Sequence, residues 1–165
     1  MPPAPVPTVT DIKPYHTMLS VHSNVNVYRG ETWKFEKYPN GFEGMKFIQS
    51  ELAYGCNSSQ NFLSFKLDRP GVVYIAYIPS GRTTLPWLLG FARHSGELRV
   101  QGLREEWAIR YKPYTSAGFV ALPGPTYQSG SKYPYLVFIG ACEIAGFVPE
   151  VKPPDAELDP GQWIW

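Results

Sequence analysis

The chain has 165 residues, of which 44% are hydrophobic and 18% are charged, a composition that predicts one globular domain. Its formal net charge of +1 gives no electrostatic argument for nucleic acid or an anionic membrane surface, so neither partner is expected. No run of about 18 consecutive apolar residues occurs, which excludes a membrane-spanning helix, and the 17 prolines and 15 glycines argue against long helices of any kind.

The N-terminal part of the chain predicts a proline-rich arm followed by strands. Residues 1–14 are interpreted as the arm, and they show neither the charged nor the apolar segment of a signal peptide, so a secreted form is expected to be a mature chain. The segments 18–28 and 31–38 alternate apolar with polar side chains, as half-solvated strands do. A Pro-Asn-Gly turn lies within 38–44.

The middle of the chain contains the most apolar predicted strand. Strands are expected at 45–50 and 61–67, with a polar loop at 51–60 between them. Residues 72–77, VVYIAY, have no polar face, which indicates a strand covered on both sides. Further strands are expected at 97–102, 105–112, 117–122 and 135–144.

Short strands separated by turn signals predict an all-β protein, an antiparallel β-sandwich or jelly roll of about eight to ten strands. This domain is expected to span 15–148, and 149–165 is interpreted as a Pro-rich, acidic tail that ends in aromatic residues. The side chains expected in the core are Phe65, Tyr74, Ile75, Val137 and Ile139.

One face of the segment 105–112 carries Trp107, Ile109 and Tyr111 at alternate positions. This face is either an inner face or an exposed aromatic platform, and Ile109 favours the inner face. Arg110 and Lys112 are then expected to point outward, together with Ala108.

The loop that follows the central strand, PSGRTTLPWLLGF, raises a question of recognition. Leu85, Leu88 and Phe91 are expected to pack into the end of the sandwich. In an extended stretch the neighbour of Leu88 points outward, so Trp87 is expected to be partly exposed beside Arg82 and to bind a sugar ring or a partner's loop. The alternative is that Trp87 plugs the end of the sandwich.

Two cysteines and one sequon bear on the compartment. Cys56 and Cys142 either form one disulfide or remain two buried free thiols. Asn57 begins an Asn-Ser-Ser acceptor pattern for N-glycosylation, which matters only if the chain is extracellular.

Nothing in the sequence indicates catalysis. His16, His22 and His94 form no metal-binding motif, and no metal or other cofactor is expected. Glu105 and Glu106 are adjacent, so on a strand they point to opposite faces, which is poor geometry for an acid/base pair. A hydrolase or lyase with dispersed carboxylates remains a third hypothesis.

The segment from about Thr32 to Gly140 resembles an accessory β-sandwich domain, similar to a carbohydrate-binding module, of secreted polysaccharide-acting and surface proteins. The resemblance is carried by WKF (33–35), FLSFKLDRPGVVYIAY (62–77), LPWLLGF (85–91), IRYKPYTSAGFVALPG (109–124) and YLVFIG (135–140), in that order. The family's aspartate near the loop arginine is missing from YIPSGR. The resemblance implies a non-catalytic, carbohydrate-associated sandwich.

The resulting hypothesis is an extracellular, non-enzymatic β-sandwich that binds or organises carbohydrate. Besides Arg82 and Trp87, the loop tyrosines Tyr114, Tyr127 and Tyr133 are its candidate ligand-binding residues. The alternative is a structural subunit of an extracellular filament or coat. In that case the terminal arms pack on neighbouring copies, with Trp163 and Trp165 adding to another subunit's sheet edge.

Overall fold

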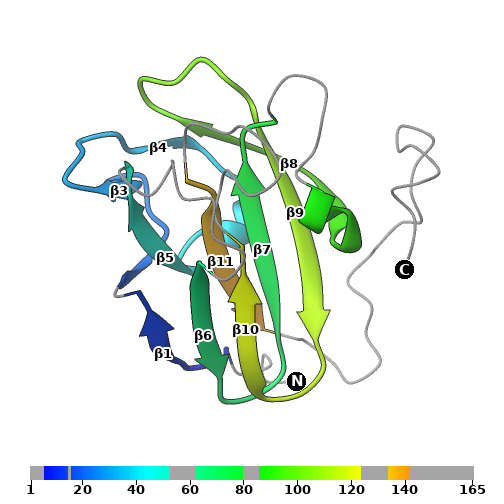
Figure 1. The fold of residues 1–165 in the computed structure, drawn as a ribbon. Helices are drawn as coiled ribbons and strands as arrows, with labels where there is room; N and C mark the ends of the chain where they lie inside the picture. The colour runs from blue at the N-terminus through cyan, green and yellow to red at the C-terminus, as the bar shows by residue number, and fades with distance from the viewer. Residues whose placement is uncertain (1–5, 15, 53–61, 80–85, 124–133, 142–165) are drawn as a thin grey trace.

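The structure is a computed structural model, and it describes residues 6–14, 16–52, 62–79, 86–123 and 134–141. These residues contain eleven β-strands and only short 3₁₀ helices, with no α-helix among them (Figure 1). The all-β class is therefore confirmed. The strand number exceeds the expected eight to ten because two of the strands are only two and three residues long.

The strands follow one another with short connections. In chain order they are β1 (Val9–Lys13), β2 (Thr17–Ser20), β3 (Tyr28–Arg29), β4 (Phe35–Lys37), β5 (Lys46–Glu51), β6 (Leu63–Leu67), β7 (Gly71–Tyr77), β8 (Ala92–Val100), β9 (Trp107–Tyr114), β10 (Gly118–Leu122) and β11 (Leu136–Ala141). The 3₁₀ helix η1 (Asn40–Phe42) precedes β5, and η3 (Pro86–Gly90) precedes β8.

The strands form two sheets. The smaller has the order β1-β6-β10, and the larger has the order β2-β5-β11-β7-β9-β8-β4, with β3 pairing to β5. Every paired strand is antiparallel to its neighbour except β3, which runs parallel to β5. In Figure 1, β6 and β10 lie in front of the larger sheet, and the 3₁₀ helix η3 is the green coil beside β9.

Strand β7 lies in the middle of the larger sheet, as expected for a strand whose sequence has no polar face. It pairs with β11 on one side and with β9 on the other, and the second pairing runs from Gly71↔Tyr114 to Tyr77↔Ala108. Alternate side chains of β7 enter different clusters, with Ile75 in one and Ala76 in the other. A strand with both faces covered needs apolar residues at every position, as the run VVYIAY shows.

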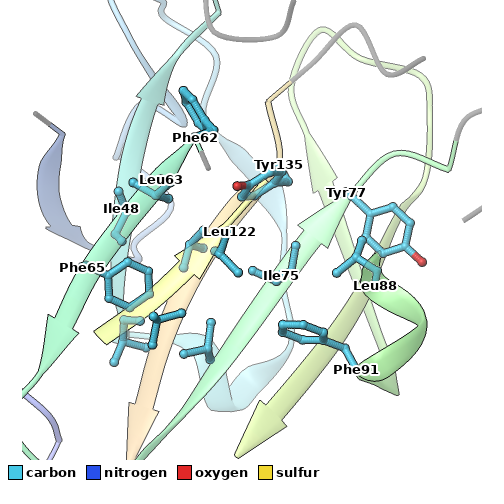
Figure 2. Close-up of a cluster of buried hydrophobic side chains, with 14 of the residues drawn as sticks. Ile48, Phe62, Leu63, Phe65, Ile75, Tyr77, Leu88, Phe91, Leu122 and Tyr135 are labelled. Atoms are coloured by element: carbon cyan, nitrogen blue, oxygen red, sulfur yellow. The ribbon is translucent and has the colours of Figure 1, made fainter. Parts of the chain in front are cut away.

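The first hydrophobic cluster lies between the two sheets (Figure 2). Phe65 and Leu122 from the smaller sheet face Ile48 and Ile75 from the larger one, and all four are buried. At the side of this cluster nearest η3, Figure 2 shows Tyr77, Leu88 and Phe91 gathered beside the helix. The smaller sheet and η3 therefore cover the same face of the larger sheet.

The second cluster lies on the opposite face of the larger sheet, which curls around it. Phe35 from β4, at one end of the strand order, contacts Phe47 from β5 near the other end, with ring centroids 5.3 Å apart. Phe138 of β11 completes the group, with its ring centroid 6.1 Å from that of Phe35. The curl brings distant strands together and buries this face without a second sheet among the described residues.

Most expected core positions are confirmed. Phe65, Ile75, Val137 and Ile139 are buried, whereas Tyr74 is only half-buried, so that expectation is wrong. Tyr74 lies on the curled face of the larger sheet, where its ring contacts those of Phe42, His94 and Tyr111.

The N-terminal segment takes part in the sheet. Residues 9–13 of the segment interpreted as an arm form β1, which pairs with β6. Thr8 also donates its backbone N–H to the Asp68 carboxylate, 2.7 Å away. No helix in the described part of the chain is long and apolar enough to span a membrane.

Phe65→Ala is expected to lower the free energy of unfolding by about 3–5 kcal/mol, because truncating a fully buried phenylalanine leaves a cavity. Phe119→Ala is the matched control, because Phe119 lies on the adjacent strand β10 and is 68% exposed. Its effect should stay within about 0.5 kcal/mol. Urea denaturation measures both variants, and similar losses would contradict the assignment of inner and outer faces.

Candidate functional site

Of the residues that the sequence proposes for ligand binding, the structure describes Trp87 and Tyr114. The other proposed residues, which lie outside the described part of the chain, are Arg82, Tyr127 and Tyr133 for binding, Cys56 and Cys142 for the disulfide, Asn57 for glycosylation, and Trp163 and Trp165 for assembly. These remain predictions.

Trp87 lies on the 3₁₀ helix η3, not in the extended stretch expected from the sequence. A 3₁₀ helix places residues three apart on one side, so Leu88 and Phe91 both turn inward, and both are buried as expected. Trp87 is half-buried, and its ring packs edge-on against Phe91 and Tyr135 at centroid distances of 6.0 and 5.3 Å. Its indole Nε1 is buried without a hydrogen-bond acceptor.

Arg110 lies beneath this helix, and the expectation that it points outward is wrong. The side chain is only 1% exposed. Its Nε donates to the Tyr77 hydroxyl at 3.0 Å and its Nη1 donates to the Phe91 carbonyl oxygen at 2.9 Å. The remaining nitrogen, Nη2, is buried without a partner. Because η3 covers this part of β9, Ala108 is buried as well.

The far end of β9 carries a cation over two aromatic rings. Lys112 is exposed as expected, and its Nζ lies 5.8 Å from the Phe91 ring centroid and 5.5 Å from that of Tyr114. Tyr114 is the last residue of β9, not a loop residue, and it is half-buried. Burial raises the pKa of its hydroxyl, so the phenol stays protonated at neutral pH.

The other face of β9 was expected to be either an inner face or an exposed aromatic platform. Trp107, Ile109 and Tyr111 are all buried, so this is an inner face and not an exposed platform. Burial is also the main reason that the pKa of Tyr111 rises to about 12.

A hollow opens between β8 and β9 where their pairing is irregular. His94 pairs with Ile109 and Leu98 pairs with Trp107, so three residues of β8 stand opposite one residue of β9. The extra residues arch away from the partner strand, as in a β-bulge. The hollow has a volume of about 480 Å³ and is lined by Arg93, His94, Ser95, Gly96, Glu97, Leu98, Arg99, Glu106, Trp107 and Ala108.

The arch is held by close packing around Gly96. The Gly96 N–H donates to His94 Nδ1 at 2.9 Å. A Cβ at position 96 would lie 2.5 Å from Pro39 Cγ and 2.8 Å from His94 Cε1, so only glycine fits here without displacing its neighbours. Burial lowers the pKa of His94, so its ring is neutral at pH 7. Because Nδ1 accepts the hydrogen bond from Gly96, the neutral ring carries its proton on Nε2.

The two carboxylates in the hollow already have cationic partners. Lys37 Nζ donates to Glu97, and the Arg99 guanidinium donates to Glu106 at 2.7 Å. The hydrogen bond and the positive charge of Lys37 lower the pKa of Glu97. The indole Nε1 of Trp107 is buried without an acceptor. Arg93 and Ser95, which also line the hollow, are exposed.

A second hollow, of about 450 Å³, lies beside Tyr74 and the ends of β5 and β11. Glu43 lines it, and both oxygens of that carboxylate are engaged, one by His22 and the other by the Tyr38 hydroxyl. These hydrogen bonds lower the pKa of Glu43. In the part of the chain that the structure describes, no group of three or more His, Cys, Asp or Glu side chains is placed to hold a metal ion.

The hollow was not expected from the sequence, because the strand predicted at 97–102 begins one residue after Gly96. The strand β8 in fact starts at Ala92, and Gly96 lies inside it. A glycine within a strand is a recognised signal of a bulge, and this signal was available in the sequence.

Comparison with known proteins shows the fold. No protein-family model matches the chain, and no curated protein sequence matches it. Among solved structures, a β-glucuronidase from glycoside hydrolase family 2 aligns with a TM-score of 0.63 at 11% identity over 79% of this chain. An enzyme of the GH138 family targeting pectin rhamnogalacturonan II aligns with a TM-score of 0.61 at 15% identity over 98% of it. The matched regions make up only 14% and 18% of those enzymes.

Trp87→Ala is expected to lower the free energy of unfolding by roughly 2 kcal/mol, below the loss for a fully buried tryptophan, because the ring is only half-buried. Leu89→Ala is the control, since Leu89 is an exposed residue of the same helix. Thermal and urea unfolding measure both. An unchanged stability would show that Trp87 does not support the end of the sandwich, and would favour a role in binding alone.

Stability is expected to fall as the pH is lowered from about 7 to about 5. Burial holds the pKa of His94 and His16 in the folded protein below their ordinary value of 6.5, so the unfolded chain takes up these protons first. In His94→Gln the decrease should be smaller. Urea unfolding at stepwise pH measures this slope, and an unaltered slope would contradict the assignment. The lowered pKa values of Glu43, Asp68 and Glu97 affect a more acidic range.

Proposed function

We propose that this protein is a non-catalytic carbohydrate-binding β-domain and that the hollow between β8 and β9 is its binding site. The observation that carries the proposal is the set of polar groups in this hollow. Its volume of about 480 Å³ lies within the range of small-ligand sites. The Ser95 hydroxyl and the Arg93 guanidinium, which belong to exposed residues of the lining, offer hydrogen bonds to the hydroxyl groups of a sugar.

The shared fold supports a role alongside carbohydrates. Both structural neighbours are carbohydrate-active enzymes by description, one a β-glucuronidase and the other an enzyme that targets a pectin. The chain aligns with less than a fifth of each enzyme, so the support is for a carbohydrate-related β-domain and not for their activities.

The electrostatics of the hollow favour binding over hydrolysis. A glycosidase needs one carboxylic acid whose pKa is raised so that it stays protonated and can donate to the leaving group. Here Glu97 has a lowered pKa, because Lys37 stabilises its charged form. Glu106 is held by Arg99. Both carboxylates of the hollow are therefore engaged in ion pairs.

The aromatic residues around η3 belong to the same proposal. Trp87 and Tyr114 are half-buried, so each residue keeps part of its surface for contact with a ligand. Arg82, Tyr127 and Tyr133 stay in the proposal as sequence-based candidates. An extracellular location is also part of the proposal, supported by the resemblance to domains of secreted proteins, and a Cys56–Cys142 bridge seen by non-reducing mass spectrometry would agree with it.

Ser95→Tyr is expected to weaken glycan binding at least tenfold, because the larger side chain fills the hollow. Ser95 is exposed, so the fold should tolerate the change. Ser116→Tyr is the matched control, since Ser116 is an exposed serine in the turn before β10. Binding is measured on an immobilised panel of neutral and acidic plant polysaccharides, and reducing-end assays on the same panel should detect no cleavage.

Equal binding by the Ser95→Tyr and Ser116→Tyr variants would place any glycan site elsewhere, and the release of reducing ends would contradict a non-catalytic role.

The alternative of a structural assembly subunit is favoured by one observation. Strand β10 ends the smaller sheet in its strand order, and it carries Phe119 with 68% of its surface exposed. Sedimentation of the same samples separates the two functions, because a carbohydrate-binding domain need not polymerise and a filament subunit must.

A further inference from the structure

The surface bordering the hollow carries an arginine pair that the fold does not neutralise. Arg93 of β8 and Arg110 of β9 are cross-strand partners. Directly opposite residues on antiparallel strands place their side chains on the same face about 5 Å apart at Cβ, where like charges destabilise the pairing. Arg110 is buried and Arg93 is exposed at the rim of the hollow.

No carboxylate of the described residues offsets this pair. Glu97 and Glu106 border the same hollow, but Lys37 and Arg99 bind them. Arg93 forms no ion pair within the described residues, and the hydrogen bonds of Arg110 go to two neutral oxygens. Lys112 lies two residues along β9 from Arg110 and therefore on the same face. The region keeps a surplus of positive charge although the whole chain carries only +1.

Two buried hydrogen-bond donors near the hollow also lack acceptors. Arg110 Nη2 and Trp107 Nε1 are both buried, and neither has an acceptor. A buried donor without an acceptor is unfavourable, and few remain in folded proteins unless something else satisfies them. The Trp107 side chain belongs to the cluster on the curled face, whereas Arg110 points to the other face, so the donor of the hollow that a ligand can reach is the exposed guanidinium of Arg93.

We propose that the ligand of this hollow is an acidic sugar, a hexuronate residue of a glycan, whose carboxylate is bound by Arg93 and whose hydroxyl groups meet the polar lining. This inference rests on the proposed carbohydrate function and narrows it from carbohydrates in general to uronic acids. A planar guanidinium binds a carboxylate through two parallel hydrogen bonds, which gives an arginine preference over neutral sugars. Arg110 contributes positive potential from the neighbouring strand on the same face, not a direct contact.

The test is calorimetric titration of the full chain with oligogalacturonate and with the neutral galacto-oligosaccharide of equal length. We expect the acidic oligosaccharide to bind at least tenfold more tightly, and its affinity to fall as the salt concentration rises. Arg93→Gln should abolish this preference by lowering the affinity for the acidic oligosaccharide to the level of the neutral one. Arg69→Gln is the matched control, because Arg69 is an exposed arginine in the turn between β6 and β7, where it pairs with Asp68.

Unfolding temperatures give a second readout. Removing one of two opposed cations should leave the unliganded Arg93→Gln variant at least as stable as the wild type. Oligogalacturonate should raise the melting temperature of the wild type more than that of the variant. These measurements do not depend on how tightly a neutral sugar binds.

The outcomes separate the two proposals. Equal affinity for acidic and neutral oligosaccharides, or an Arg93→Gln variant that keeps the preference, would overturn the acidic-sugar inference and leave carbohydrate binding intact. Binding of neither oligosaccharide would count against both. Inorganic phosphate that binds as tightly as the oligogalacturonate would show a general anion site and would also overturn the assignment to a sugar.

Discussion

The central strand β7 has no polar side, and the need to cover both faces of its sheet determines how the other elements are arranged. On one face the smaller sheet covers Ile75 and its neighbours, but this sheet is only three strands wide. The 3₁₀ helix η3 extends the cover over β9. On the opposite face no separate layer is present among the described residues, so the larger sheet bends until Phe35 meets Phe47.

The polar features that suggest function arise where this covering is least regular. Arg110 is buried because η3 lies over it, and Phe91, the residue that follows the helix, supplies one carbonyl oxygen to its guanidinium. The hollow between β8 and β9 forms where regular pairing stops after His94 and resumes at Leu98. A sheet that paired without interruption would have placed the side chains of this segment side by side and left no space between them.

The fold could be predicted from the sequence wherever the alternation of apolar and polar residues and the positions of turn-forming residues agree. The run VVYIAY identified the central strand, and Phe65, Val137 and Ile139 followed from their apolar neighbours. Three features could not be predicted in this way. Period two gives the two faces of β9 but not which segment covers them, so Arg110 was assigned to solvent. The 3₁₀ turn at Trp87 depends on tertiary packing, and Gly96 resembled the end of a strand although it lies within one. The candidate site is built largely from these features, so sequence patterns located its strands but not its geometry.

The packing around Gly96 has a consequence for how a ligand would be received. Because Pro39 and His94 both approach this glycine closely, the arch of β8 is held between two neighbours before any ligand arrives. The shape of the hollow is therefore set when the chain folds. A ligand entering a rigid recess orders few additional side chains, so less of its contact energy is lost to conformational entropy. A rigid recess also cannot adjust to a longer or wider ring, so selectivity by shape would accompany selectivity by charge.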